Sequence, residues 1–155
     1  MLRQRGATLI EVLISVLVLA VGLLGLAATQ MMSMKNGNSA QQRYMATLAA
    51  HDMAERMRAN LEGVETGSYD GTVDGSEAGN SDCSGGCSAA ELAAMDKREW
   101  GQLIKTNLPS ASGEISRKSG EVTVTVKWKE QHTGENYGGG AGGPEDAEFE
   151  MTVEL

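Results

Sequence analysis

The sequence predicts an α+β fold in which a long N-terminal helix packs on a small antiparallel sheet. Three patterns support this: an apolar run from Ala7 to Ala28, apolar residues recurring every four positions around Met53, and two C-terminal segments that alternate apolar and polar residues. The chain has 155 residues, which is about one domain at the usual ~100–200 residues per domain. We therefore expect a single small domain attached to an extended helix.

The apolar run is long enough to cross a membrane. As a helix rising about 1.5 Å per residue, Ala7 to Ala28 spans roughly 33 Å, against a bilayer core of about 30 Å. Arg3 and Arg5 precede the run, and most of the 21 acidic residues follow it. The positive-inside rule then predicts that Met1 lies in the cytoplasm and that the C-terminal domain lies outside.

Glu11 is the only ionisable residue within this run. A carboxylate in a membrane span typically costs about 2.5–3.5 kcal/mol at mid-membrane and less near the interface, so it indicates a function and needs a partner. Two plainer interpretations stay open. One is a signal anchor in which the acid has no role, and the other is a secretory signal peptide with the small-x-small sequence Gly25-Leu26-Ala27. The length of the run and its early acid disfavour the signal peptide.

The N-terminal segment RGATLIEVLISVLVLAVGLLGLA resembles the class III signal of type IV pilins and pseudopilins. A short basic leader ends at Gly6, and Glu11 is the fifth residue of the apolar helix that follows. The resemblance is closest to the type IV pilus modification protein (PilV) family of minor pilins. The sequence differs from the common pattern at Ala7, where Phe is frequent.

The resemblance implies a sequence of processing and assembly steps. A prepilin peptidase would cut between Gly6 and Ala7, and the new amine of Ala7 would be N-methylated. Glu11 would then pair with the N-terminal amine of a neighbouring subunit. The implied function is a minor pilin, without cofactors, that acts with other minor pilins and the major pilin to initiate or cap a type IV pilus. Its location would be the inner membrane and then the pilus surface.

Two other functions stay open at this point. One is a minor pseudopilin of a type II secretion system, which shares the N-terminal signal. The other is a membrane-anchored periplasmic binding module that keeps Met1 and never assembles. The pilin interpretation divides the chain into a leader, a transmembrane or filament-core helix, an amphipathic helix and a periplasmic α+β domain, at residues 1–6, 7–28, 29–61 and 62–155.

The helical pattern extends beyond the apolar run. Met45, Ala49, Met53 and Met57 recur every four residues, with Leu48 and Leu61 beside them, and charged residues occupy the other faces. We expect one helix from Ala7 to about Leu61, with the polar KNGN segment at 35–38 as a candidate interruption. The Met stripe is expected to be core packing, and His51 is expected at or near the surface.

Residues 62–87 are rich in Gly, Ser and acids, which is typical of an irregular exposed loop. Its acids do not follow the spacing of an EF-hand, so a solvated loop is favoured over a calcium site; they are Asp70, Asp74, Glu77 and Asp82. Cys83 and Cys87 lack the further ligands that zinc requires. In an oxidising periplasm a structural disulfide between them is expected, and we expect no metal site.

The remaining sequence predicts a second helix and a sheet. Ser88 and Glu91 form a capping-box signature that opens the helix, Asp96-x-x-Glu99 is a candidate restart, and Leu108-Pro109 closes it. Trp100, Leu103 and Ile104 form its apolar face. Strands are expected at Glu114–Arg117, Glu121–Trp128 and Ala147–Leu155, and their apolar face should pack on the Met45–Leu61 helix.

Composition argues against several functional classes. The net charge is −8 and aromatic residues are 4% of the chain, whereas nucleic-acid binders carry basic surfaces and stacking aromatics. The two histidines, His51 and His132, are far apart in sequence, and no P-loop or dinucleotide-binding fingerprint occurs. We therefore expect a protein that binds no nucleic acid and is not an enzyme.

Overall fold

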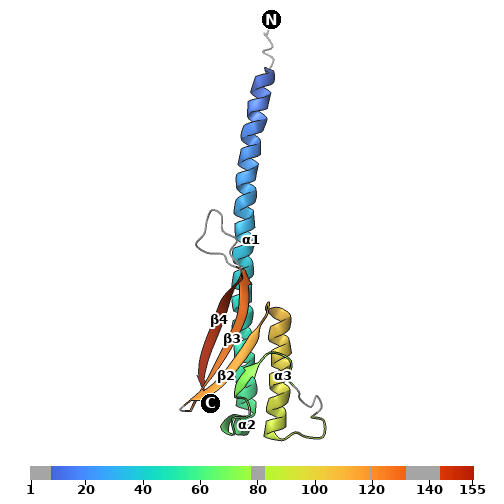
Figure 1. Ribbon diagram of the computed structural model, residues 1–155, viewed down its shortest axis with the longest axis vertical. Helices are drawn as coiled ribbons and strands as arrows, with labels where there is room; N and C mark the ends of the chain where they lie inside the picture. Colours follow the sequence, from blue (N-terminus) through green and yellow to red (C-terminus); the bar gives the residue numbers. More distant parts are fainter. Residues whose placement is uncertain (1–7, 78–82, 119, 132–143) are drawn as a thin grey trace. The chain divides into compact units, whose positions relative to one another are not determined.

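The computed structural model describes residues 8–77, 83–118, 120–131 and 144–155. The chain divides into two compact units, residues 1–37 and residues 38–155. The fold class is the α+β arrangement that the sequence predicts, with a long apolar N-terminal helix and a small four-stranded antiparallel sheet (Figure 1). This arrangement is pilin-like.

Helix α1 runs from Leu9 to Ala59 without a break. It begins where the backbone N–H of Glu11 donates to the carbonyl of Thr8 at 3.0 Å. The interruption considered at residues 35–38 is absent, since that segment is helical throughout. A single Gly costs only about 1 kcal/mol in a helix interior, and Lys and Asn are tolerated there, so the segment does not stop the helix.

The helix ends at Ala59, two residues before the predicted position, because Asn60 caps a new short helix. The Asn60 side chain accepts a hydrogen bond from the backbone N–H of Gly63 at 3.2 Å, and helix α2 follows at Leu61–Glu65. The predicted exposed loop is therefore ordered at its start. Helix α2, the buried Tyr69 and strand β1 at Gly71–Val73 all fall within it.

Strand β1 lies against the second long helix, α3 (Ala89–Asn107). The contact is a close backbone approach: a Cβ built on Gly101 of α3 would lie 2.7 Å from the backbone nitrogen of Gly75, just after β1. Gly75 also has a positive φ of 80°, which favours glycine. Composition alone could not indicate this strand, because its neighbours are distant in sequence.

Helix α3 begins and ends where the sequence predicts. Ser88 and Glu91 form a complete capping box, and Leu108 is the C-cap residue. The candidate restart at Asp96-x-x-Glu99 is wrong, because the helix continues through it and Asp96 is buried. Trp100 and Ile104 are buried as expected, whereas Leu103 stays 40% exposed.

The sheet has the order β1-β2-β3-β4, and all of its neighbours are antiparallel. The three longer strands are β2 (Ser112–Lys118), β3 (Glu121–Gln131) and β4 (Pro144–Glu154). Strands β2 and β4 begin before the predicted residues, and β2 and β3 end after them. The strands are longer because cross-strand pairing continues into polar residues. Val124 of β3, for example, pairs with Ile115 of β2 and Met151 of β4.

The inner face of the sheet packs on α1 and α3 around one core. The predicted inward residues of β3 are at most 2% exposed, and they are Val122, Val124, Val126 and Trp128. From α1 the core receives Ala49, Met53 and Met57, so the Met stripe is core packing. Leu48 and Leu61, which flank this stripe in the sequence pattern, stay 45% and 49% exposed.

Polar contacts also fix α1 to α3 and to the sheet within residues 38–155. The indole Nε1 of Trp100 donates to the carbonyl of Ala49 at 2.7 Å, in the core. Near the end of β3, Glu130 is 8% exposed and pairs with Arg43 at 3.0 Å, and the hydroxyl of Ser39 donates to the same carboxylate. The C-terminal half of α1 is therefore part of the small domain.

Candidate functional site

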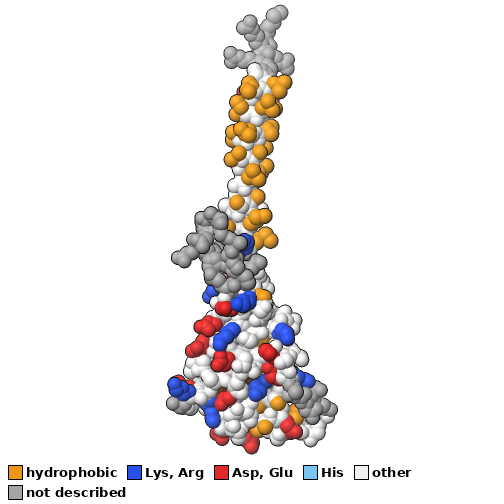
Figure 2. Space-filling model, viewed as in Figure 1, with side chains coloured by type: hydrophobic (Ala, Val, Ile, Leu, Met, Phe, Trp, Pro, Cys, Tyr) orange, Lys and Arg blue, Asp and Glu red, His pale blue; other side chains and the backbone are white. Residues whose placement is uncertain are grey.

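The segment of α1 from Leu9 to Ala28 is apolar around the helix, with Glu11 and Ser15 as its polar residues. Its large apolar side chains from Leu9 to Leu26 are all more than half exposed, between 52% at Val12 and 79% at Leu9. Orange side chains cover the visible face of this segment in Figure 2. A helix that is apolar all round is stable when lipid or other protein covers it, and this one is long and apolar enough to cross a membrane.

Glu11 is the one charged side chain between Leu9 and Met34. It lies in the first turn of α1, where the positive end of the helix dipole favours a carboxylate. The side chain is exposed, and it makes no ion pair with any of the residues that the structure describes. Ser15 contacts only its backbone, donating to the Glu11 carbonyl at 2.7 Å.

The N-terminus matches a known family model. Residues 1–27 match the model of the prokaryotic N-terminal methylation motif. The match supports a type IV pilin-like protein. No curated protein and no solved structure matches the chain.

This motif carries general consequences for the pilin-like chain. It implies processing by a prepilin peptidase and assembly with other pilins, and it points to a structural protein. Together with the apolar helix it suggests membrane anchoring. Gly6 and Ala7, which the sequence predicts to flank the cleavage site, lie outside the described residues, so their roles stay predictions, as does the role of Glu11.

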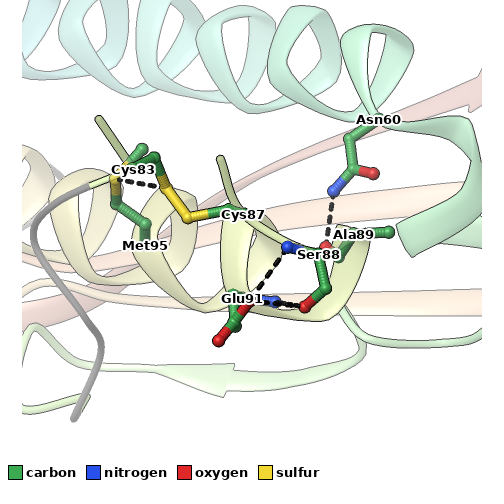
Figure 3. Close-up of a disulfide and its surroundings, with 7 residues drawn as sticks. All are labelled: Asn60, Cys83, Cys87, Ser88, Ala89, Glu91 and Met95. Carbon is green, nitrogen blue, oxygen red and sulfur yellow. Dashed lines mark hydrogen bonds between the residues drawn. A yellow bond between two sulfur atoms is a disulfide. The ribbon is translucent and has the colours of Figure 1, made fainter. Parts of the chain in front are cut away.

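Cys83 and Cys87 form a disulfide immediately before α3 (Figure 3). Their Cα atoms are 5.2 Å apart, and the backbone N–H of Gly86 donates to the Cys83 carbonyl at 2.9 Å. The sulfur of Cys83 lies 3.8 Å from that of Met95, two turns into the helix. The bridge therefore ties Cys83 to the start of α3.

The capping box adds to this anchoring. Ser88 follows Cys87 directly, and its backbone N–H donates to the Glu91 carboxylate at 2.9 Å. Hydrogen bonds from the Ser88 backbone and hydroxyl hold the pKa of Glu91 below its usual value. The ionised carboxylate is favoured in the folded state, so this contribution is lost as the pH falls through that lowered pKa.

A buried polar network joins α1, α2, α3 and the segment between α2 and β1. The hydroxyl of Tyr69 donates to Asp96 at 2.6 Å, and Arg56 pairs with the other oxygen of the same carboxylate at 3.0 Å. Asn60 donates to the Tyr69 oxygen at 3.1 Å and to the carbonyl of Ala89 at 2.8 Å. Asp96, buried in the middle of α3, is thus fully paired.

The network shifts the pKa of two of its members. Burial raises the pKa of Tyr69 well above its usual value, and the hydrogen bond to Asp96 adds to this shift. For Arg56, burial alone would lower the pKa, but hydrogen bonds to Glu99, Asp52 and Asp96 outweigh it and raise the pKa. Tyr69 is therefore neutral and Arg56 charged throughout the physiological range.

Two of the acids considered for calcium, Asp74 and Glu77, make local hydrogen bonds instead. The Glu77 carboxylate accepts hydrogen bonds from the backbone N–H groups of Asp74 and Gly75. Hydrogen bonds from Ser76 lower the pKa of Asp74. Among the described residues no group of three or more potential ligands gathers as a metal site, while Asp82 lies outside them. His51 is exposed as expected, and His132 lies outside the described residues.

Sequence reasoning found the N-terminal motif, the disulfide pair and the capping box, but it missed the polar network. A single aromatic residue in a Gly-rich stretch, Tyr69, was the one available signal. The partners Arg56 and Asp96 looked like ordinary charged helix residues. Their pairing depends on how α1 and α3 pack, which no local pattern encodes.

Proposed function

We propose that this protein is a minor pilin of the PilV type, which assembles with other minor pilins to initiate or cap a type IV pilus. The supporting observation is the position of Glu11, the one exposed carboxylate in the apolar N-terminal part of α1, within the segment that matches the methylation motif. The proposal assigns residues 7–28 to the filament core and residues 62–155 to a periplasmic domain. The mature subunit would leave the inner membrane for the pilus surface.

The mechanism follows from the cost of a charge in an apolar environment. A prepilin peptidase cuts between Gly6 and Ala7, which removes Arg3 and Arg5 and creates a new amine at Ala7. That amine, after methylation, pairs with Glu11 of a neighbouring subunit. The attraction is strong because the dielectric is low, and it offsets the cost of burying either charge alone.

The first experiment is mass spectrometry of the mature N-terminus. The chain is isolated from membranes and from sheared surface fibres of the native host. We expect a chain that begins at N-methylated Ala7 in both fractions. Processing at Ala7 without any signal in fibres would favour a type II secretion pseudopilin. An intact Met1 would indicate an unprocessed anchor, and a start at Ala28 would indicate a secreted domain.

A substitution of Glu11 tests the assembly step separately. Glu11→Gln keeps the size and polarity of the side chain but removes the charge that would pair with the amine. We expect normal cleavage at Gly6 and loss of the subunit from sheared fibres. Glu62→Gln, which removes an exposed acid from α2, is the matched control and should leave incorporation unchanged. Wild-type incorporation of Glu11→Gln would disprove the assigned role.

A further inference from the structure

Among the described residues, the sheet ends in one long edge strand, β4, with no strand beyond it. Strand β1 at the other edge has 3 residues, whereas β4 has 11. Within the described residues, β4 pairs only with β3. Alternate residues of an edge strand direct their backbone N–H and C=O groups away from the sheet, and these groups can pair with another strand. The β4 edge therefore offers a template for strand addition.

The inner face of β4 is also incompletely covered. The inward residues of β3 are fully buried, but their neighbours on β4 are only half-buried, and these are Ala147, Phe149, Met151 and Val153. The core thus thins towards the open edge. An added strand with apolar residues on its inner face would continue the sheet and cover these side chains.

The outer face of β4 carries an excess of negative charge, although Asp146 near its start binds Lys129 of β3 at 2.6 Å. Glu148 lies opposite Lys127, which also binds Glu114 at 2.8 Å. Glu150 lies opposite Thr125, and Glu154 lies opposite another acid, Glu121. Lys or Arg side chains on an added strand would face these carboxylates directly, and opposite charges across strands are stabilising.

The same charges disfavour a second copy of this chain as the partner. Antiparallel pairing of two β4 strands about Glu150 places Glu150 opposite its own copy and Asp146 opposite Glu154 of that copy. Pairing about Met151 places Glu148 opposite Glu154. Like charges directly opposite each other are destabilising in a sheet, so the edge selects a different chain.

We propose that β4 is a docking edge for a neighbouring, non-identical pilin-like subunit, which adds an extended segment with alternating apolar and basic residues. This inference rests on the proposed function for the class of its partner. It specifies the contact: backbone hydrogen bonds along β4, apolar contacts beside Phe149 and Met151, and basic side chains against Glu150 and Glu154.

Site-specific photo-crosslinking in the native host tests the proposal with the full chain. A benzophenone amino acid replaces Thr152, which is exposed on β4. In the control it replaces Ser116, which is exposed two strands away on β2. We expect Thr152, but not Ser116, to crosslink to a Lys- or Arg-bearing segment of another pilin-like subunit, identified by peptide mass spectrometry. The crosslink is measured in membranes as well as in fibres, so docking can be detected before the subunit assembles into a pilus.

A charge reversal provides the matched comparison. Glu150→Lys combined with Glu154→Lys breaks no ion pair between residues that the structure describes. A Lys at position 154 would face Glu121, so the fold should be preserved. We expect the crosslink from position 152 to fall by about tenfold or more, because like charges oppose docking. Glu62→Lys combined with Glu65→Lys, on α2, adds the same charge elsewhere and should leave the crosslink unchanged.

The outcomes separate this proposal from the proposed function. A crosslink in membranes without the subunit in fibres would support the docking edge and contradict the pilus role. No crosslink from Thr152 in either fraction, a crosslink to a second copy of this chain, or an unchanged crosslink after charge reversal would overturn the docking edge. Incorporation into fibres in any of those cases would leave the proposed function standing.

Discussion

The hydroxyl of Tyr69 lies 2.6 Å from a carboxylate oxygen of Asp96, although the two residues are 27 positions apart in sequence. Tyr69 is 1% exposed and Asp96 is 5% exposed. Arg56 neutralises the carboxylate from the other side, at 3.0 Å. This pair connects the chain before β1 to the middle of α3.

Replacing Tyr69 with Phe should destabilise the domain. Tyr69→Phe removes the donor to Asp96 and the acceptor for Asn60, and a buried group left without its partner costs about 1–3 kcal/mol. The measurement is urea unfolding of the full chain in detergent, followed by the fluorescence of the buried Trp100 and Trp128. Tyr44→Phe, at a 61% exposed position, should stay within about 0.5 kcal/mol of wild type. Equal effects of the two substitutions would contradict the assigned role.

The raised pKa of Tyr69 predicts a loss of stability at alkaline pH. Burial, and then the hydrogen bond to Asp96, keep the phenol protonated in the folded state. The unfolded chain releases this proton near pH ~10, so above that pH the unfolded state binds fewer protons and stability falls as the pH rises. Unfolding free energies between about pH 8 and 11 should show this slope in wild type, and a smaller slope in Tyr69→Phe. If the unfolding free energy falls equally steeply with pH in wild type and in Tyr69→Phe, Tyr69 is not the cause of the alkaline loss of stability.

Removing the disulfide should weaken the start of α3. The bridge closes a small ring with a sequence separation of 4 between Cys83 and Cys87, for which the chain-entropy relation gives roughly 2 kcal/mol. Replacing both cysteines with Ser should lower the unfolding free energy by about that amount. Hydrogen exchange should increase at Ala89 and nearby amides but not in β3. A reductant should lower the unfolding free energy of wild type by a similar amount and should not change that of the variant without cysteines.

Gly113 should not tolerate a side chain, because Trp100 occupies the space. A Cβ on Gly113 would lie 2.1 Å from Cζ3 of the Trp100 ring, which is held by its hydrogen bond to Ala49. Gly113→Ala should therefore cost about 1–3 kcal/mol through overpacking and should change the fluorescence of Trp100. Gly85→Ala, where a Cβ would meet nothing within 4 Å, is the control. An unchanged unfolding free energy in Gly113→Ala would mean that the Trp100 ring can move to make room for the added methyl group.

The sequence correctly predicted features that depend on neighbouring residues. The alternation from Val122 to Trp128 predicts a strand with one buried face, since side chains alternate across a sheet. Ser88 and Glu91 predict the start of α3, because a capping box needs only residues three apart. The same locality explains two errors. The polar residues at 35–38 suggested a break in α1, but a single Gly does not interrupt the helix. The Gly-rich composition of residues 62–87 suggested an irregular loop, so strand β1 was not predicted.

Local sequence patterns are enough to predict the apolar helix with its acid at Glu11, the Met stripe of α1 and the two alternating strands. Each is a periodic or short-range pattern, so its physical cause is contained in the residues that show it. The tertiary structure decided the pairing of Tyr69 with Asp96, the place of β1 and the open edge at β4. These depend on which distant segments meet as the apolar faces of α1, α3 and the sheet are buried together.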